Sequence, residues 1–123
     1  PIKLMLSAGA SLVARVFADV KQVEWILKEA FKHKGFCFIE IIQPCIIFHP
    51  QAIKYKEKTY FLHDEKHDKT SFEMAMKKAE EFDYNTTNRI PLGIFYQVNK
   101  PVFEEQFPQL KKLGKDGWKG IKR

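Results

Sequence analysis

The sequence lacks a long apolar run and a Gly-rich phosphate loop. No stretch reaches the roughly 18 apolar residues that a membrane-spanning helix needs, because the longest one, residues 35–50, contains Glu40, Gln43 and Pro44. The six glycines form neither a GxGxxG nor a P-loop spacing, and no serine lies in a nucleophile elbow. These absences argue against a membrane span, the common nucleotide-binding loops and the α/β-hydrolase triad.

The sequence also lacks a secretory signal and a disulfide framework. Residues 1–6 carry one charge, too short an apolar stretch for a signal and no initiating Met. We expect from this start that the chain begins inside a longer protein, with N-terminal processing as the alternative. Its two cysteines, Cys37 and Cys45, would lie about 26 Å apart in an extended segment, too far for a disulfide. Free thiols are typical of a reducing compartment, so we expect a cytoplasmic protein.

Positive charge is concentrated at the C-terminus. The chain has 21 Lys and Arg against 15 Asp and Glu, a net charge of +6. Residues 108–123 hold six basic residues and one acidic residue, so they account for +5 of this charge. Such a tail can dock on nucleic acid, anionic lipid or an acidic protein, and a solvated terminus is an equal alternative. We therefore predict a folded body, residues 1–107, and a basic tail, residues 108–123.

The first half of the chain has the pattern of a strand, a helix and a second strand. Residues 11–17 are β-prone and mostly apolar, with Arg15 as their one charge. Asp19 is a suitable N-cap for the helix that follows. One face of this helix carries apolar residues at helical spacing: Val20, Val23, Ile26, Leu27, Ala30 and Phe31. Residues 36–42 are apolar on both alternating faces apart from Glu40, which predicts a parallel strand buried on both sides and a right-handed βαβ crossover.

The second half predicts a loop, a helix and a further strand. Residues 51–69 are charged and irregular, which predicts a long surface loop. Thr70–Glu73 form a capping-box pattern that begins a helix running to about Phe82. Residues 91–98 predict a strand, and an extended tail begins at Pro101. Because these elements cover only part of a sheet, we expect an α/β fold with a partial parallel sheet and flanking helices, packed against further sequence or a partner subunit.

Cys45 is the best candidate for a functional residue. It follows Pro44 at the carboxyl end of the second predicted strand, the edge where ligands gather in open α/β sheets. Pro44 cannot donate to the ladder, so it ends the strand and presents the thiol at the rim. The thiol is a nucleophile, a metal ligand or core filler, and spacing alone favours filler. His49, four residues on, is a weak candidate for its base, and Cys37 in mid-strand is interpreted as structural.

The other titratable residues are interpreted as solvated. His63 and His67 have a spacing that could bind one metal on a helix, but the stretch has no apolar face, so we expect a solvated, charged loop. His33 is interpreted as a cation at the helix end. Glu80 and Glu81 are interpreted as exposed carboxylates.

Five segments together resemble the β subunit of 2-oxoacid:ferredoxin oxidoreductases. They are residues 7–15 with the helix that follows, 33–36, 43–45, 90–96 and 101–105. Members of this family are thiamine-diphosphate enzymes that oxidise pyruvate, 2-oxoglutarate or related acids with coenzyme A. The resemblance extends to about Phe107 and implies the C-terminal half of a thiamine-diphosphate-binding fold.

The resemblance implies a specific role for Cys45. This residue falls on the family's downstream cluster cysteine, one of the four ligands of a [4Fe–4S] cluster beside the thiamine. The other three ligands, and the motif for thiamine diphosphate and Mg²⁺, would lie upstream of this sequence. Where the family continues Pro-Cys with a pattern such as Val-Thr-Phe-Asn, this chain has Ile46, Ile47, Phe48 and His49, so a hydroxyl and an amide near the cofactor are absent.

The implied function is part of an oxidoreductase that oxidatively decarboxylates a 2-oxo acid to an acyl-CoA, with ferredoxin as electron acceptor. The cofactors would do this chemistry, and the chain would supply sheet scaffold and one cluster ligand, without activity of its own. The implied partners are the α subunit of the same enzyme, ferredoxin, a 2-oxo acid and coenzyme A.

Two competing interpretations remain. The chain is a small basic α/β module that binds nucleic acid or a protein through its C-terminal tail, or a degenerate fragment that folds poorly. The basic module accounts for the charge but not for Cys45 at a strand end, and no aromatic RNA-binding signature supports it.

Overall fold

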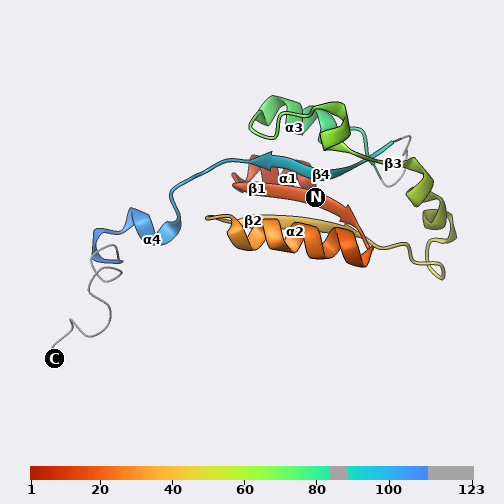
Figure 1. Ribbon diagram of the computed structural model, residues 1–123, viewed down its shortest axis with the longest axis horizontal. Helices are drawn as coiled ribbons and strands as arrows, with labels where there is room; N and C mark the ends of the chain where they lie inside the picture. Colours follow the sequence, from red (N-terminus) through yellow and green to blue (C-terminus); the bar gives the residue numbers. More distant parts are fainter. Residues whose placement is uncertain (84–88, 111–123) are drawn as a thin grey trace.

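A mixed four-stranded sheet runs through the middle of the protein, which the computed structural model describes over residues 1–83 and 89–110 (Figure 1). β1 (Leu12–Phe17) pairs in parallel with β2 (Cys37–Ile42) and antiparallel with β4 (Ile90–Gln97). β3 (Thr59–Phe61) pairs in parallel with β4, which gives the strand order β2-β1-β4-β3. The α/β class is confirmed, whereas the sheet is mixed rather than wholly parallel, because β3 and β4 run opposite to β1 and β2.

Helices cover the two faces of the sheet (Figure 1). α2 (Val20–Lys32) lies on one face, where Ile26 packs against the apolar side of β1. α1 (Ile2–Ser7) and α3 (Phe72–Ala79) lie on the other, where Leu6 and Ala75 meet Phe95 of β4. All six residues of β1 are buried, so the core of the fold is centred on this strand.

α2 begins where the sequence predicts. The Asp19 carboxylate accepts hydrogen bonds from the backbone N–H groups of Lys21 and Gln22 at 3.1 and 3.2 Å, which satisfies two free donors of the first turn. The predicted apolar face is buried only at its centre, however. Val20 and Phe31 at its ends remain 83% and 87% exposed.

β2 corrects the prediction of a strand buried on both sides. It is an edge strand in the described residues. Phe38 packs on one of its faces and Ile39 on the other, whereas Ile41 is 47% exposed. The parallel βαβ order of β1, α2 and β2 is confirmed by the pairing of Leu12 with Cys37 and of Phe17 with Ile42. Both apolar faces of β2 are therefore covered only in part, because the strand has a neighbouring strand on one side only among the described residues.

The predicted loop over residues 51–69 is wrong. This segment forms a 3₁₀ helix, η1 (Pro50–Lys58), then β3, then a second 3₁₀ turn, η2 (Leu62–Glu65). Ala52, Tyr55 and Leu62 are buried in it. These apolar residues are too widely spaced among charged ones to give a periodic signal, and tertiary packing selects them.

α3 and the C-terminal elements are close to their predicted positions. The N-cap is Ser71, whose hydroxyl accepts from the backbone N–H of Met74 at 3.2 Å, so the predicted capping box is displaced by one residue. α3 ends at Ala79 rather than near Phe82. The strand predicted at residues 91–98 is β4.

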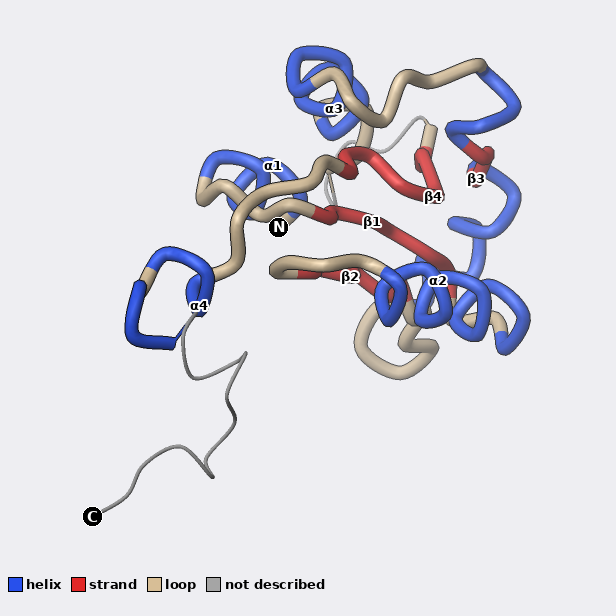
Figure 2. Tube along the Cα trace, turned by 60° about the vertical axis from the view of Figure 1, so that its left-hand side comes forward, coloured by secondary structure: helices blue, strands red, loops and turns tan. Residues whose placement is uncertain are grey.

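A short helix, α4 (Phe103–Gln106), replaces the extended tail that was predicted and stands apart from the sheet (Figure 2). An ion pair between Lys34 and Glu105 connects it to the end of α2. Most of the predicted basic tail, residues 111–123, lies outside the described residues. In the described part of the chain, no helix has both the length and the apolar character to cross a membrane.

Candidate functional site

Cys45 lies in an exposed turn just past the carboxyl end of β2. We call residues 43–49 the Cys45 turn. Because Phe17 pairs with Ile42, β1 and β2 end side by side, and the turn follows at that edge of the sheet. The Cys45 thiol is free and exposed, which confirms its predicted place at the rim and contradicts the core-filler interpretation.

A pocket of about 480 Å³ opens beside the thiol. Its lining residues come from the end of β2, the Cys45 turn and η1: Ile41, Ile42, Gln43, Cys45, His49, Ala52 and Tyr55. The walls combine apolar side chains such as Ile41, Ile42 and Ala52 with polar groups from Gln43 and His49. The pocket therefore combines one sulfur donor with space for a bound group.

The described residues offer one metal ligand here, not a complete site. No group of three or more His, Cys, Asp or Glu side chains within residues 1–83 and 89–110 is placed to hold a metal ion. An iron–sulfur cluster takes about four thiolates, so Cys45 fits such a cluster as a single ligand, with the other ligands supplied from outside this part of the chain.

The arrangement of His49 argues against a Cys–His nucleophile. His49 contacts Cys45 through the backbone, its N–H donating to the Cys45 carbonyl at 2.8 Å. The His49 ring is instead hydrogen-bonded through Nε2 to the Tyr55 hydroxyl at 2.9 Å. A catalytic base would have to direct its ring toward the thiol.

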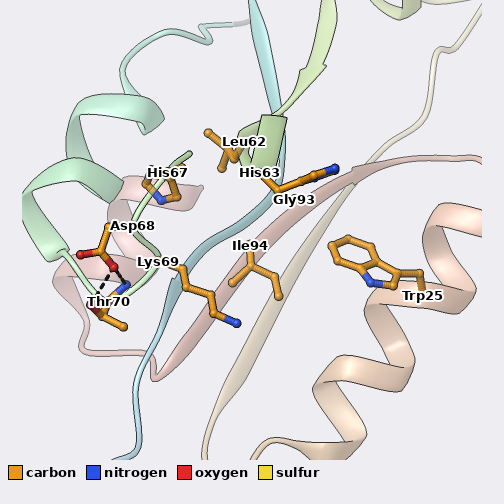
Figure 3. A pocket seen from close by; sticks show the side chains of 9 residues that line it. All are labelled: Trp25, Leu62, His63, His67, Asp68, Lys69, Thr70, Gly93 and Ile94. Carbon is orange, nitrogen blue, oxygen red and sulfur yellow. Dashed lines mark hydrogen bonds between the residues drawn. The ribbon is translucent and has the colours of Figure 1, made fainter. Parts of the chain in front are cut away.

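A second pocket, of about 440 Å³, lies on the α2 side of the sheet (Figure 3). Trp25 of α2 stands on one side and Leu62 of η2 on the other, with Gly93 and Ile94 of β4 between them. Several of its polar residues are already engaged in hydrogen bonds. The Lys69 ammonium donates to Gln97 at 2.7 Å, and the Asp68 carboxylate accepts from both the backbone N–H and the hydroxyl of Thr70. Among the described residues that line this pocket there is no Ser or Cys, and the Thr70 hydroxyl already donates to Asp68 at 2.7 Å.

His67, which also lines this second pocket, corrects the prediction of a solvated histidine. Its Nε2 donates to the Phe95 carbonyl of β4 at 2.8 Å, and its Nδ1 is buried without a partner among the described residues. His63 is exposed, as predicted, and its Nε2 lies 2.9 Å from Asp64. The two rings have different partners, so their spacing does not reflect a shared metal.

His33 and Glu81 also differ from their predictions. The Ser11 hydroxyl donates to the Phe36 carbonyl, so His33 Nε2 donates to Ser11 Oγ at 2.9 Å. Burial lowers the pKa of His33, which favours the neutral ring over the predicted cation. Glu81 accepts from the Tyr60 hydroxyl at 2.6 Å and is not simply solvated. Its neighbour Glu80 is exposed, as predicted.

Cys37 remains structural, as predicted. It is partly buried beside α2, its Sγ lies 3.7 Å from the Ala30 carbonyl, and burial raises its thiol pKa. A raised pKa keeps the thiol protonated and a poor ligand. Burial thus distinguishes Cys37, which is interpreted as structural, from Cys45, whose thiol is exposed.

The sequence interpretation missed a buried ion pair. Arg15 and Glu40 are only 2% and 7% exposed, and Arg15 Nε donates to Glu40 Oε2 at 2.6 Å. The guanidinium also lies between the Phe82 and Phe95 rings, 4.7 and 5.1 Å from their centroids. The available signal was one opposite charge in each of two apolar strands, at positions that pair in the parallel register.

The comparisons with known proteins agree on one family. Residues 53–112 match the family described as the C-terminal part of the pyruvate ferredoxin oxidoreductase beta subunit. A 2-oxoacid:ferredoxin oxidoreductase subunit beta from Saccharolobus solfataricus is 36% identical over 110 residues, which cover 79% of this chain and 35% of the relative. Subunit beta of 2-oxoacid:ferredoxin oxidoreductase 1 from Aeropyrum pernix is 36% identical over 124 residues, covering 89% of this chain and 37% of the relative.

A solved structure shares the fold. The 2-oxoglutarate:ferredoxin oxidoreductase from Magnetococcus marinus, determined with 2-oxoglutarate, coenzyme A and succinyl-CoA bound, superposes with a TM-score of 0.78 at 25% identity. The match covers 98% of this chain and 40% of that one. The chain therefore spans well under half the length of the proteins that it matches.

Proposed function

The chain belongs to the family of 2-oxoacid:ferredoxin oxidoreductase β subunits, and on this premise we propose that it works as the C-terminal part of such a subunit. The proposed reaction is the oxidative decarboxylation of a 2-oxo acid to an acyl-CoA, with ferredoxin as electron acceptor. The ligands named for the Magnetococcus marinus structure support this substrate class. The proposed partners are the α subunit of the same enzyme and ferredoxin, in the cytoplasm.

The observation that carries this proposal is the exposed thiol of Cys45 at the edge where two parallel strands end. We propose that Cys45 is one thiolate ligand of a [4Fe–4S] cluster. Such a cluster, when bound, accepts and passes on single electrons. We assign no residue of this chain to thiamine diphosphate or Mg²⁺, whose sites would lie in the remainder of the subunit.

The described residues would position this ligand rather than react. The buried pair of Arg15 and Glu40 links β1 to β2 near their centres and holds the two strand ends together. Ile42 is buried and accepts a backbone hydrogen bond from Ala18 at 2.9 Å, so the first end of the Cys45 turn is fixed to the core. A ligand on a fixed strand end keeps its distance to partners from elsewhere in the enzyme.

The test is an iron and acid-labile sulfide count on the complete, anaerobically assembled enzyme. Cys45→Ser should lose about one four-iron cluster per β subunit, together with the reduction of ferredoxin. Cys37→Ser is the matched control, because it removes the other thiol of the same chain and should leave the iron content unchanged. Full iron content and activity in Cys45→Ser would contradict the proposal.

The division at residue 108 and the role of the basic tail stay predictions. The alternative, a basic module that binds nucleic acid or a protein through this tail, has no support from the described residues, since most of the tail lies beyond them.

A further inference from the structure

We infer that the hydrogen bond between His49 and Tyr55 fixes the Cys45 turn to the body of the protein, which makes these two residues positioning residues for the Cys45 thiolate. The inference rests on the proposed role of Cys45 and goes beyond it. The family resemblance gives neither residue a role, and His49 stands where the family pattern has a different side chain.

Within the described residues, the side chains at the centre of the Cys45 turn do not pack in the core. Its three central side chains, Ile46, Ile47 and Phe48, are exposed, with Phe48 at 90%. The His49 N–H donates to the Cys45 carbonyl at 2.8 Å, which closes the turn on itself in the i→i+4 manner of an α-turn. This bond sets the shape of the turn, but it does not fix the turn to anything else.

Tyr55 supplies a fixed point. It lies in η1, is 7% exposed, and belongs to a buried cluster with Phe17, Ile42 and Phe82. Its ring meets Phe82 edge to face, with centroids 5.9 Å apart and planes at 86°. A tyrosine packed in this way has little freedom, so its hydroxyl is a rigid hydrogen-bonding partner.

His49 joins the turn to that fixed point. Its Nε2 is 2.9 Å from the Tyr55 hydroxyl, and its own backbone N–H holds the Cys45 carbonyl. The turn is thus fixed at both ends, through buried Ile42 before it and through the His49 ring after it. Ile42 and His49, which fix the two ends of the turn, line the same pocket as Cys45.

Loss of the bond would remove the side-chain contact at the far end of the turn. Among the described residues that end would then be held by the backbone alone, through the Ala52 N–H that donates to the His49 carbonyl at 2.9 Å. The thiolate would then sample a wider range of positions, and a ligand that leaves its position more often releases its metal faster. One net hydrogen bond corresponds to a change of about 3- to 10-fold in such an equilibrium.

The experiment uses the complete enzyme, assembled without oxygen, and measures the rate of iron release to a ferrous chelator. Tyr55→Phe removes only the hydroxyl, and His49→Ala removes only the ring. Each should release iron about 3- to 10-fold faster than the native enzyme. Tyr60→Phe is the matched control, because it removes a different bonded hydroxyl, the one held by Glu81, and should leave the rate unchanged.

Two further variants separate positioning from general destabilisation. The amide of His49→Gln reaches about as far as Nε2, so this variant should restore the native rate. The double variant with His49→Ala and Tyr55→Phe should release iron no faster than either single variant, because both act through one bond. The electron paramagnetic resonance spectrum of the reduced cluster should change in Tyr55→Phe and not in Tyr60→Phe. Native release rates in both single variants, or additive effects in the double variant, would overturn the inference.

A thiol measurement distinguishes failure of this inference from failure of the proposed function. If Cys45→Ser retains its iron, the proposed function is wrong, and the anchor is then tested by alkylation of the enzyme with iodoacetamide. Tyr55→Phe should change the alkylation rate of Cys45 about 3- to 10-fold, with Cys37 as an internal control at its native rate. If the ratio of the Cys45 and Cys37 alkylation rates is the same in Tyr55→Phe as in the native enzyme, the hydrogen bond between His49 and Tyr55 does not fix the Cys45 turn.

Discussion

β1 and β2 are strands of six residues with similar sequences and different surroundings. Each is apolar apart from one charge, Arg15 in β1 and Glu40 in β2. Every residue of β1 is buried, whereas β2 lies at the sheet edge with Ile41 open to solvent. The comparison teaches that composition predicts a strand, while the number of neighbouring strands decides how much of it is covered.

The same contrast extends to the segments that follow the two strands. β1 leads through Ala18 and the Asp19 cap directly into α2, so its carboxyl end is part of a rigid connection. β2 leads into the Cys45 turn, which presents a free thiol and three apolar side chains to the outside. The interior strand is part of the buried scaffold, and the edge strand leads into an exposed surface that carries the Cys45 thiol.

The largest expected difference in unfolding free energy is between two phenylalanine variants, one in the interior of the sheet and one in the Cys45 turn. Phe95→Ala in β4, where the side chain is fully buried, should lower the free energy of unfolding by about 3–5 kcal/mol. Phe48→Ala in the exposed Cys45 turn should change it by less than about 0.5 kcal/mol. Denaturant unfolding of both variants measures the difference, and equal losses would show that the turn is covered in the isolated chain.

The next effect concerns the charge pair that joins the two strands. Glu40→Gln leaves the Arg15 guanidinium buried without its counter-charge and should cost about 3 kcal/mol, measured by the same unfolding experiment. Replacing both residues, with Arg15→Met and Glu40→Leu, should recover most of that loss, because no uncompensated charge remains. If the double variant is as unstable as Glu40→Gln, the ion pair stabilises the fold by more than the neutralisation of its two buried charges.

The smallest effect is a pH dependence of stability that arises from His33 at the C-terminal end of α2. Burial lowers the folded-state pKa of His33 from the ordinary value of 6.5, so the neutral ring stabilises the fold. This contribution is complete above pH 6.5 and is lost as the pH falls through the lowered pKa of the folded state. His33→Gln should therefore flatten the decline in unfolding free energy between about pH 7.5 and 5.5. An unchanged slope would assign that decline to other groups.

Local signals predicted the elements that local chemistry determines. Asp19 caps α2 because a short acidic side chain there meets free N–H groups within the same turn. Pro44 predicted the end of β2 and the exposure of Cys45, since a residue without an N–H cannot continue a ladder. The βαβ order followed from the change of periodicity between residues 11 and 42.

Non-local contacts account for the failures. Residues 51–69 look like a loop because Tyr55 and Leu62 stand alone among charges, and only their contacts with distant residues bury them. His67 looks solvated for the same reason, until the Phe95 carbonyl of β4 reaches its ring. The hydrogen bond between His49 and Tyr55 joins residues only six positions apart. No sequence pattern predicts it, because the position of the Tyr55 hydroxyl depends on the packing of its ring against Phe82.

The sequence by itself determined the α/β class, the parallel pairing of β1 with β2, the place of Cys45 at a strand end and, through the resemblance, the enzyme family. These depend on periodicity, capping and turn chemistry, which act over a few residues, and on the order of segments. The tertiary structure alone decided the antiparallel entry of β4, the edge position of β2, the pairing of Arg15 with Glu40 and the anchor beneath the Cys45 turn. Each of these depends on which surfaces meet after the chain has folded, because burial and hydrogen bonding between distant residues are properties of the packed molecule.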